Sequence, residues 1–116
     1  MRQVVCDAAD LEPGGMVAAT LGPMPIVVIR SSDGSLHSML DKCLHQGGRL
    51  SRGRLLTATG GASPGDYREE DGRTIVKCPW HGYEYDIRTG CTLFDEERRL
   101  RVFTVVEEDG QIVVET

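Results

Sequence analysis

Three Asp-Gly pairs, at Asp33, Asp71 and Asp109, each lie directly before a run of alternating or β-branched residues. Asp-Gly is a strong signal for a two-residue hairpin turn, because both positions tolerate a positive φ angle. Short β-rich runs recur along the chain, at residues 3–6, 16–21, 25–30, 35–40, 73–78, 83–87, 100–106 and 111–115. The pattern therefore predicts an all-β fold in which hairpins carry much of the topology.

Helical periodicity is weak throughout the sequence. No apolar stripe at i, i+3, i+4, i+7 spacing persists over several turns, and the one short candidate, residues 94–100, cannot form a stable helix alone. The chain has 116 residues, which is enough for one modest core but too few for two ordinary domains. We therefore expect a single domain that spans residues 1–116.

Charge and hydropathy exclude several classes of function. The net charge is -5 at pH 7, and an acidic surface gains nothing from phosphates, so we expect no nucleic-acid partner. An acidic protein pairs more readily with a basic patch on another protein. No apolar run reaches the roughly 18 residues that a membrane helix needs, and the N-terminus lacks the features of a secretory leader. These observations predict a cytoplasmic chain without a membrane partner.

Residues 54–72 differ in composition from their surroundings. The segment is rich in Gly, Ser and Thr and ends in a run of charged residues. Such a composition predicts an irregular surface insertion, because added residues cost least in connections. A lid that docks a partner over a nearby site is the alternative.

Two motifs combine cysteine with histidine. Cys43 and His45 form a Cys-x-His motif, and Cys78 and His81 form a Cys-x-x-His motif. Without a secretory leader, cysteines are expected to be reduced thiols or metal ligands rather than disulfides. A thiolate is a soft donor and an imidazole a borderline one, so two of each suit zinc or an iron–sulfur cluster far better than calcium or magnesium. The four residues therefore predict a metal site.

The two motifs resemble those of the Rieske [2Fe-2S] family. The first is Cys-Leu-His with a Gly-rich continuation, and the second is Cys-Pro-Trp-His-Gly-Tyr-Glu-Tyr-Asp, residues 78–86. The resemblance extends to ADLEPG near the start, to IRSSDG and DIRTG, and to the closing VVEEDGQIVVE. It implies a Rieske-type antiparallel β-sandwich with a small cluster-binding subdomain, which is inserted by two loops at about 43–48 and 78–83.

The resemblance also implies a ligand set for one [2Fe-2S] cluster per chain. By position in the motifs, Cys43 and Cys78 would hold one iron, while His45 and His81 would hold the other. Neutral imidazoles in place of two thiolates raise the reduction potential above that of all-cysteine ferredoxins. A structural zinc site is the alternative, since two cysteines and two histidines also form a closed zinc set.

Two departures from the family's respiratory members point to its low-potential branch, the ferredoxins and oxygenase-type domains. Those members join the loops by a disulfide and place a serine after the glycine of the second loop. This chain has Gly48 and Trp80 at the disulfide positions and Tyr83 at the serine position. A lost hydroxyl donor makes the cluster harder to reduce, although the Tyr85 hydroxyl could still reach a cluster thiolate. We expect a potential of about -150 mV, and a redox titration giving a value well above zero would contradict this.

The histidine count favours electron transfer over catalysis. A terminal Rieske oxygenase needs two further histidines and a carboxylate for a mononuclear iron, and only His37 remains here. The resemblance therefore implies a Rieske-type ferredoxin that carries single electrons from a reductase to a terminal oxygenase or other redox enzyme. Such a protein is not catalytic alone and takes no small-molecule substrate. A small subunit of a nitrite-reductase-like enzyme is the alternative.

Other residues that could carry chemistry have simpler explanations. His37 lies in the predicted strand 35–40, and we expect it to have no ligand role. Cys6 and Cys91 are expected to act as small core residues. Trp80 is expected to pack over the second cluster loop.

Overall fold

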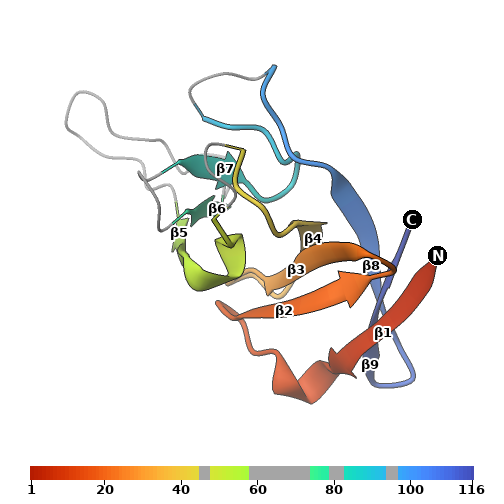
Figure 1. The fold of residues 1–116 in the computed structure, drawn as a ribbon. Coiled ribbons are helices and arrows are strands. Elements are labelled where there is room, and N and C mark those ends of the chain that lie inside the picture. The colour runs from red at the N-terminus through yellow and green to blue at the C-terminus, as the bar shows by residue number, and fades with distance from the viewer. Residues whose placement is uncertain (45–47, 58–73, 79–82, 94–96) are drawn as a thin grey trace.

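Nine β-strands and two short 3-10 turns make up the described part of the chain (Figure 1). The computed structural model describes residues 1–44, 48–57, 74–78, 83–93 and 97–116. The strands are β1 (Arg2–Asp7), β2 (Met16–Leu21), β3 (Met24–Arg30), β4 (Leu36–Leu40), β5 (Arg54–Thr57), β6 (Thr74–Lys77), β7 (Glu84–Asp86), β8 (Val102–Glu108) and β9 (Gln111–Glu115). The turns are η1 (Ala8–Asp10) and η2 (Leu50–Arg52). The predicted all-β fold is confirmed.

Six strands form one antiparallel sheet in the order β1-β9-β8-β4-β3-β2. Strand β8 joins its two halves, because Val102 and Phe103 pair with β4 whereas residues 104–108 pair with β9. Apolar side chains from both halves meet in a first core, formed by Leu11, Leu21, Ile26, Val28, Phe103, Ile112 and Val114. The two halves therefore pack as the predicted β-sandwich.

Three strands form a second antiparallel sheet in the order β5-β6-β7. Residues 54–57, which the sequence places in the irregular insertion, form β5 instead, with Leu55 opposite Val76 of β6. Leu55 packs against a second core, so backbone pairing and burial outweigh the Gly- and Ser-rich composition that follows. This second core is formed by Val27, Ile29, Met39, Cys43, Leu50, Val76, Cys78, Tyr85, Ile87 and Leu100. The predicted start of the insertion at residue 54 is wrong, and its residues 58–72 lie outside the described residues.

Strand β3 is buried on both of its faces. Ile26, Val27, Val28 and Ile29 each have 0% exposure. Because successive side chains of a strand point to opposite faces, Ile26 and Val28 enter the first core, whereas Val27 and Ile29 enter the second. Full burial of such a side chain contributes about 1.5–3 kcal/mol. Strand β3 therefore couples the sandwich to the small sheet.

Two of the three predicted Asp-Gly hairpins lie in the described part, and both are confirmed. Residues 31–35, which include Asp33 and Gly34, connect β3 to β4 in a connection longer than the predicted two-residue turn, and Asp109 and Gly110 connect β8 to β9. The φ angles of Asp109 and Gly110 are 52° and 77°, which a two-residue hairpin turn requires. The third pair, at Asp71, lies outside the described residues.

The helical candidate at residues 94–100 is not helical where it is described. Its residues 94–96 lie outside the described residues, and Arg99 forms an isolated β-bridge with Cys91. This bridge brings the segment after β7 alongside the segment that leads into β8 (Figure 1).

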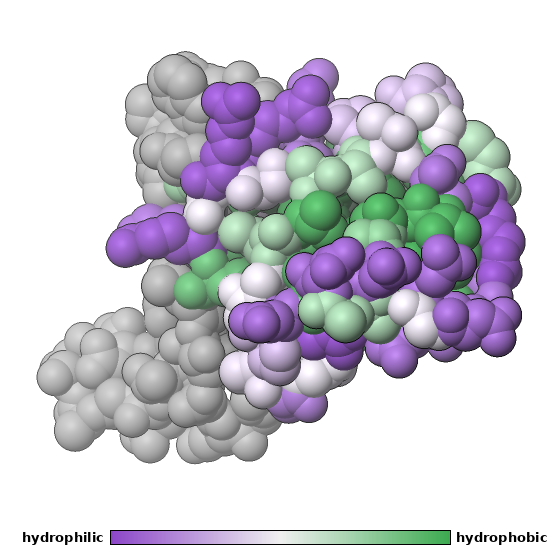
Figure 2. All heavy atoms as spheres, turned by 90° about the horizontal axis from the view of Figure 1, so that it is seen from below, coloured by the Kyte–Doolittle hydropathy of each residue, from purple (hydrophilic) through white to green (hydrophobic). Residues whose placement is uncertain are grey.

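The described residues include no helix with the length and apolar character of a membrane span. Among them, the large hydrophobic side chains that remain exposed are those of Met1, Val4, Leu44 and Val102. Figure 2 views the molecule from below and shows apolar surface in the middle of that face, bordered by hydrophilic residues. Leu44 is the exposed residue that directly follows a predicted ligand, Cys43.

Candidate metal centre

Two loops each begin at a buried cysteine. Cys43 follows β4 of the large sheet, and Cys78 follows β6 of the small sheet. The Cys43 N–H donates to the Gly48 carbonyl oxygen at 2.7 Å, and the Cys78 N–H donates to the Tyr83 carbonyl oxygen at 2.8 Å. These hydrogen bonds close both loops at the residues where the sequence predicts that they begin and end. The two cysteines therefore lie where the two sheets meet.

The side chains of Cys43 and Cys78 are suited to holding a metal. Each residue is 1% exposed, and both belong to the same core cluster as Tyr85. None of the chain's four cysteines is in a disulfide. Two buried thiols at the base of neighbouring loops fit the thiolate half of an iron–sulfur ligand set. His45 and His81 lie outside the described residues, so their ligand role stays a prediction.

Tyr85 supplies a hydroxyl beside one of these thiols. Its phenol oxygen accepts a hydrogen bond from the Leu44 N–H at 2.9 Å and lies 3.3 Å from the Cys43 Sγ. Because the Leu44 N–H can only donate, the phenol O–H is available to donate to the sulfur. The residue that sequence reasoning names as a possible hydroxyl donor therefore contacts Cys43.

Burial keeps this phenol protonated. Desolvation raises the pKa of Tyr85 well above its ordinary value, and the hydrogen bond to Cys43 raises it further. The Tyr85 O–H is therefore retained at neutral and moderately alkaline pH. A neutral donor next to a thiolate removes electron density from the sulfur and favours the reduced state of a metal bound to it.

The Tyr85→Phe variant is expected to have a lower reduction potential at the proposed metal site than the wild-type protein. If the O–H to sulfur bond is about 1.4 kcal/mol stronger in the reduced state, the potential falls by about 59 mV when the bond is lost. Protein-film voltammetry of the two proteins measures this shift, with Tyr83→Phe as the matched control and a smaller shift expected there. A Tyr85→Phe protein with the wild-type potential would show that the hydroxyl does not tune the site.

His37 lies on β4 opposite Ile29 of β3. Its Nε2 is 2.9 Å from the Ser35 Oγ, and burial lowers the pKa of His37 below its ordinary value. Among the described residues, no group of three or more His, Cys, Asp or Glu side chains is arranged to hold a metal. The assignment of no ligand role to His37 stays a prediction.

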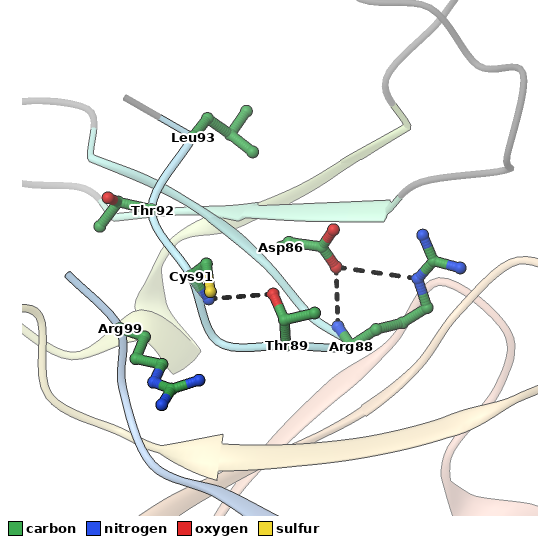
Figure 3. Close-up of a pocket in the computed structure, with 7 residues that line it drawn as sticks. All are labelled: Asp86, Arg88, Thr89, Cys91, Thr92, Leu93 and Arg99. Carbon is green, nitrogen blue, oxygen red and sulfur yellow. Dashed lines mark hydrogen bonds and ion pairs between the residues drawn. The ribbon is translucent and has the colours of Figure 1, made fainter. Parts of the chain in front are cut away.

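Cys6 and Cys91 differ in their surroundings. Cys6 is half-buried and packs against the first core, as expected. Cys91 instead lines a surface pocket of about 510 Å3 (Figure 3), so its assignment to the core is wrong. The bridge to Arg99 holds the Cys91 backbone beside this pocket. The pocket is lined by Asp86, Arg88, Thr89, Cys91, Thr92, Leu93 and Arg99.

The turn after β7 forms one wall of this pocket. Figure 3 shows the Asp86 carboxylate between two contacts, since it accepts the Arg88 N–H at 2.9 Å and lies 3.9 Å from the Arg88 Nε. The Cys91 N–H donates to the Thr89 Oγ1 at 3.1 Å. The DIRTG segment therefore forms a turn whose polar side chains satisfy its own backbone.

Sequence reasoning missed Asp41, a buried carboxylate near the first loop. It has 0% exposure, and its oxygens accept hydrogen bonds from the backbone and the side chain of Ser51. An acidic residue that directly follows a strand and lies two positions before Cys43 is a weak signal. The structural role of Asp41 follows from its two hydrogen bonds with Ser51, which the sequence alone does not predict.

Comparisons with known proteins identify relatives that cover most of this chain. The family model of the Rieske [2Fe-2S] domain matches residues 1–105. The anthranilate 1,2-dioxygenase ferredoxin subunit of Burkholderia cepacia is 37% identical over 106 residues, which cover 89% of this chain and 78% of that protein. Apoptosis-inducing factor 3 of Homo sapiens is 33% identical over 90 residues. This chain spans 12% of the length of that relative and 58% of a human Rieske domain-containing protein.

A solved structure shares the fold over nearly the whole chain. It is the putative NADH-dependent nitrite reductase small subunit from Mycobacterium tuberculosis, with a TM-score of 0.79, 23% identity, and coverage of 98% of this chain and 93% of that one. At this identity the likeness concerns the fold alone. The family match includes both cysteine loops, whose buried thiols fit iron–sulfur ligation. This chain therefore belongs to the Rieske [2Fe-2S] domain family, whose cofactor is one [2Fe-2S] cluster per domain.

Proposed function

We propose that this chain is a Rieske-type ferredoxin, which receives single electrons from a reductase and passes them to a terminal oxygenase or another redox enzyme. The observation that carries this proposal is the 37% identity with a dioxygenase ferredoxin subunit across most of both chains. By this analogy the chain is an electron-carrying component and is not catalytic alone. Only His37 remains beyond the predicted ligands, whereas a mononuclear iron site of a terminal oxygenase needs two further histidines, which supports the same conclusion.

The proposed ligands are Cys43 and Cys78 on one iron, and His45 and His81 on the other. Burial of both thiols within one core supports the cysteine half of this set. When bound, a cluster of this type supplies one-electron redox chemistry, which zinc does not. The chain's own contribution is to exclude water from the thiols and to hold the Tyr85 O–H next to the Cys43 Sγ.

A protein partner is proposed to contact the chain near Leu44. This side chain is 46% exposed and lies between two proposed ligands, Cys43 and His45. An exposed apolar residue at such a position suits the centre of a small interface, and a basic rim on the partner would complement the net charge of -5. A cytoplasmic location, and the lack of nucleic-acid and membrane partners, stay predictions from the sequence.

The test of this function begins with the purified protein. Visible absorbance, analysis of iron and acid-labile sulfide, and a rhombic EPR signal after dithionite reduction are expected from a [2Fe-2S] cluster with mixed ligands. Reoxidation of the reduced protein by cytochrome c then tests electron transfer to a protein. A colourless protein with bound zinc and no EPR signal on reduction would overturn the proposal.

A permanent subunit of a nitrite-reductase-like enzyme is the second candidate. The fold shared with a putative nitrite reductase small subunit favours it. The presence of all four predicted ligand residues favours the mobile carrier instead, because a subunit with a structural role needs no cluster ligands. Size-exclusion chromatography distinguishes the two, since a carrier elutes without a large partner whereas a subunit co-purifies with one at fixed stoichiometry.

A further inference from the structure

Among the described residues between the two cysteine loops, η2, β5 and β6 connect the first loop to the second. After the first loop closes at Gly48, η2 leads to Gly53 and then to β5, which pairs with β6 directly before Cys78. Leu50, the first residue of η2, has 0% exposure and belongs to the same core cluster as Cys43 and Cys78. The first residue of η2 therefore packs in the core that contains both cysteines.

Asp41 ties η2 to the start of the first loop. Its Oδ1 accepts the Ser51 N–H at 2.8 Å, and its Oδ2 accepts the Ser51 O–H at 2.6 Å. The Asp41 N–H donates to the Pro25 carbonyl oxygen at 2.9 Å, which anchors the residue to β3. The Arg49 Nη1 lies 3.8 Å from Oδ2 and partly balances the charge. A fully buried carboxylate with both oxygens bonded to one residue holds that residue in place.

Gly53 ties the other end of η2 to the second loop. A Cβ at this position would lie 1.9 Å from the carbonyl oxygen of Lys77, the residue directly before Cys78. Only glycine lacks this atom, so only glycine permits the two backbones to approach so closely. The Gly53 N–H also donates to the Leu50 carbonyl oxygen at 2.8 Å, which keeps η2 compact.

We propose that Asp41 is a positioning residue, which sets the separation of Cys43 and Cys78 through Ser51, η2 and the contact of Gly53 with Lys77. The inference rests on the proposed ligand set. Two thiolates must lie at a fixed separation to hold one iron, and residues around a ligand set its orientation and the affinity of the site. Asp41 holds one end of η2, and the other end of η2 adjoins Lys77 and Cys78. Loss of the Asp41 carboxylate therefore lets the two thiols move apart.

Four variants of the full chain test this role. Asp41→Ala removes both hydrogen-bond acceptors, and we expect about a 10- to 100-fold loss of cluster affinity, measured as faster cluster release to a chelator. Asp41→Asn is expected to rescue the site, because its amide oxygen accepts the Ser51 N–H and its NH2 donates to the Ser51 Oγ. Ser51→Ala is expected to release its cluster at a rate between those of the wild type and Asp41→Ala. Ser38→Ala, which removes another buried hydroxyl that donates to the Val27 carbonyl oxygen at 3.0 Å, is the matched control.

The EPR g values and the reduction potential separate positioning from general destabilisation. We expect both to shift in Asp41→Ala and Ser51→Ala, and to stay at wild-type values in Asp41→Asn and Ser38→Ala. Wild-type g values, potential and cluster release in Asp41→Ala would overturn the inference. If Asp41→Ala does not fold, as judged by circular dichroism, the comparison moves to Ser51→Ala and Ser38→Ala. Equal g values, reduction potentials and rates of cluster release in these two variants would overturn the inference. A wild-type protein that binds no [2Fe-2S] cluster would overturn the proposed function, and the inference with it.

Discussion

The Cys43→Ala variant is expected to purify without its [2Fe-2S] cluster, whereas the Cys91→Ala variant is expected to retain it. Cys43 is 1% exposed and lies in one core with Cys78 and Tyr85, whereas Cys91 is half-buried and lines a surface pocket. Loss of a residue next to a ligand costs about 10- to 100-fold in metal affinity, and loss of a ligand costs more. Iron and sulfide content per chain, together with visible absorbance, measures the difference.

Circular dichroism provides the control for folding in this comparison. Removal of one buried sulfur atom costs on the order of 1 kcal/mol through the cavity that it leaves, so both variants are expected to keep the β-rich spectrum. A folded Cys43→Ala protein with the wild-type content of iron and sulfide would remove Cys43 from the proposed ligand set. Loss of the cluster from Cys91→Ala would show that the site extends into the turn after β7.

The strands that the sequence predicts share one physical basis. Strand β3 contributes a continuous apolar run because both of its faces are buried, and β9 follows a hairpin turn whose Asp109 and Gly110 both adopt a positive φ angle. Strand β5 was not predicted, because a Gly- and Ser-rich segment follows it directly in the sequence. Its pairing with β6 depends on a partner that is distant in the sequence, and local composition cannot predict such a partner.

For the predicted site too, the sequence indicates the residues within short motifs but not the contacts between residues that are distant in the chain. Cys43 and Cys78 could be identified from their motifs, because metal ligands must be specific residue types at short spacing. The contact of Tyr85 with Cys43 could be anticipated only as a possibility from the resemblance. The role of Asp41 could not, because a carboxylate is informative only once its burial and its bonds to Ser51 are known. A motif identifies the donors, but long-range packing determines what holds them.

The Gly90→Ala variant is expected to lose far more stability than Gly34→Ala, although both glycines have a similar positive φ angle. The φ angles are 77° at Gly90 and 90° at Gly34, so alanine pays a conformational cost of about 1–2 kcal/mol at either position. A Cβ at Gly34 would meet nothing within 4 Å, whereas a Cβ at Gly90 would lie 2.3 Å from the Leu100 carbonyl oxygen. The difference between the variants therefore isolates the close backbone approach.

The close approach at Gly90 connects the turn after β7 to the core. The Gly90 N–H donates to the Asp86 carbonyl oxygen at 2.8 Å, and the Leu100 N–H donates to the Gly90 carbonyl oxygen at 2.9 Å. Leu100 is 2% exposed and packs in the core that contains Tyr85, so a displaced turn disturbs the residues behind the metal site. We expect a total loss of about 3 kcal/mol or more, seen by thermal unfolding as a fall in Tm of more than about 10 °C, against about 4–8 °C for Gly34→Ala. Equal Tm values for the two variants would show that the backbone at Gly90 can move away from Leu100 without cost.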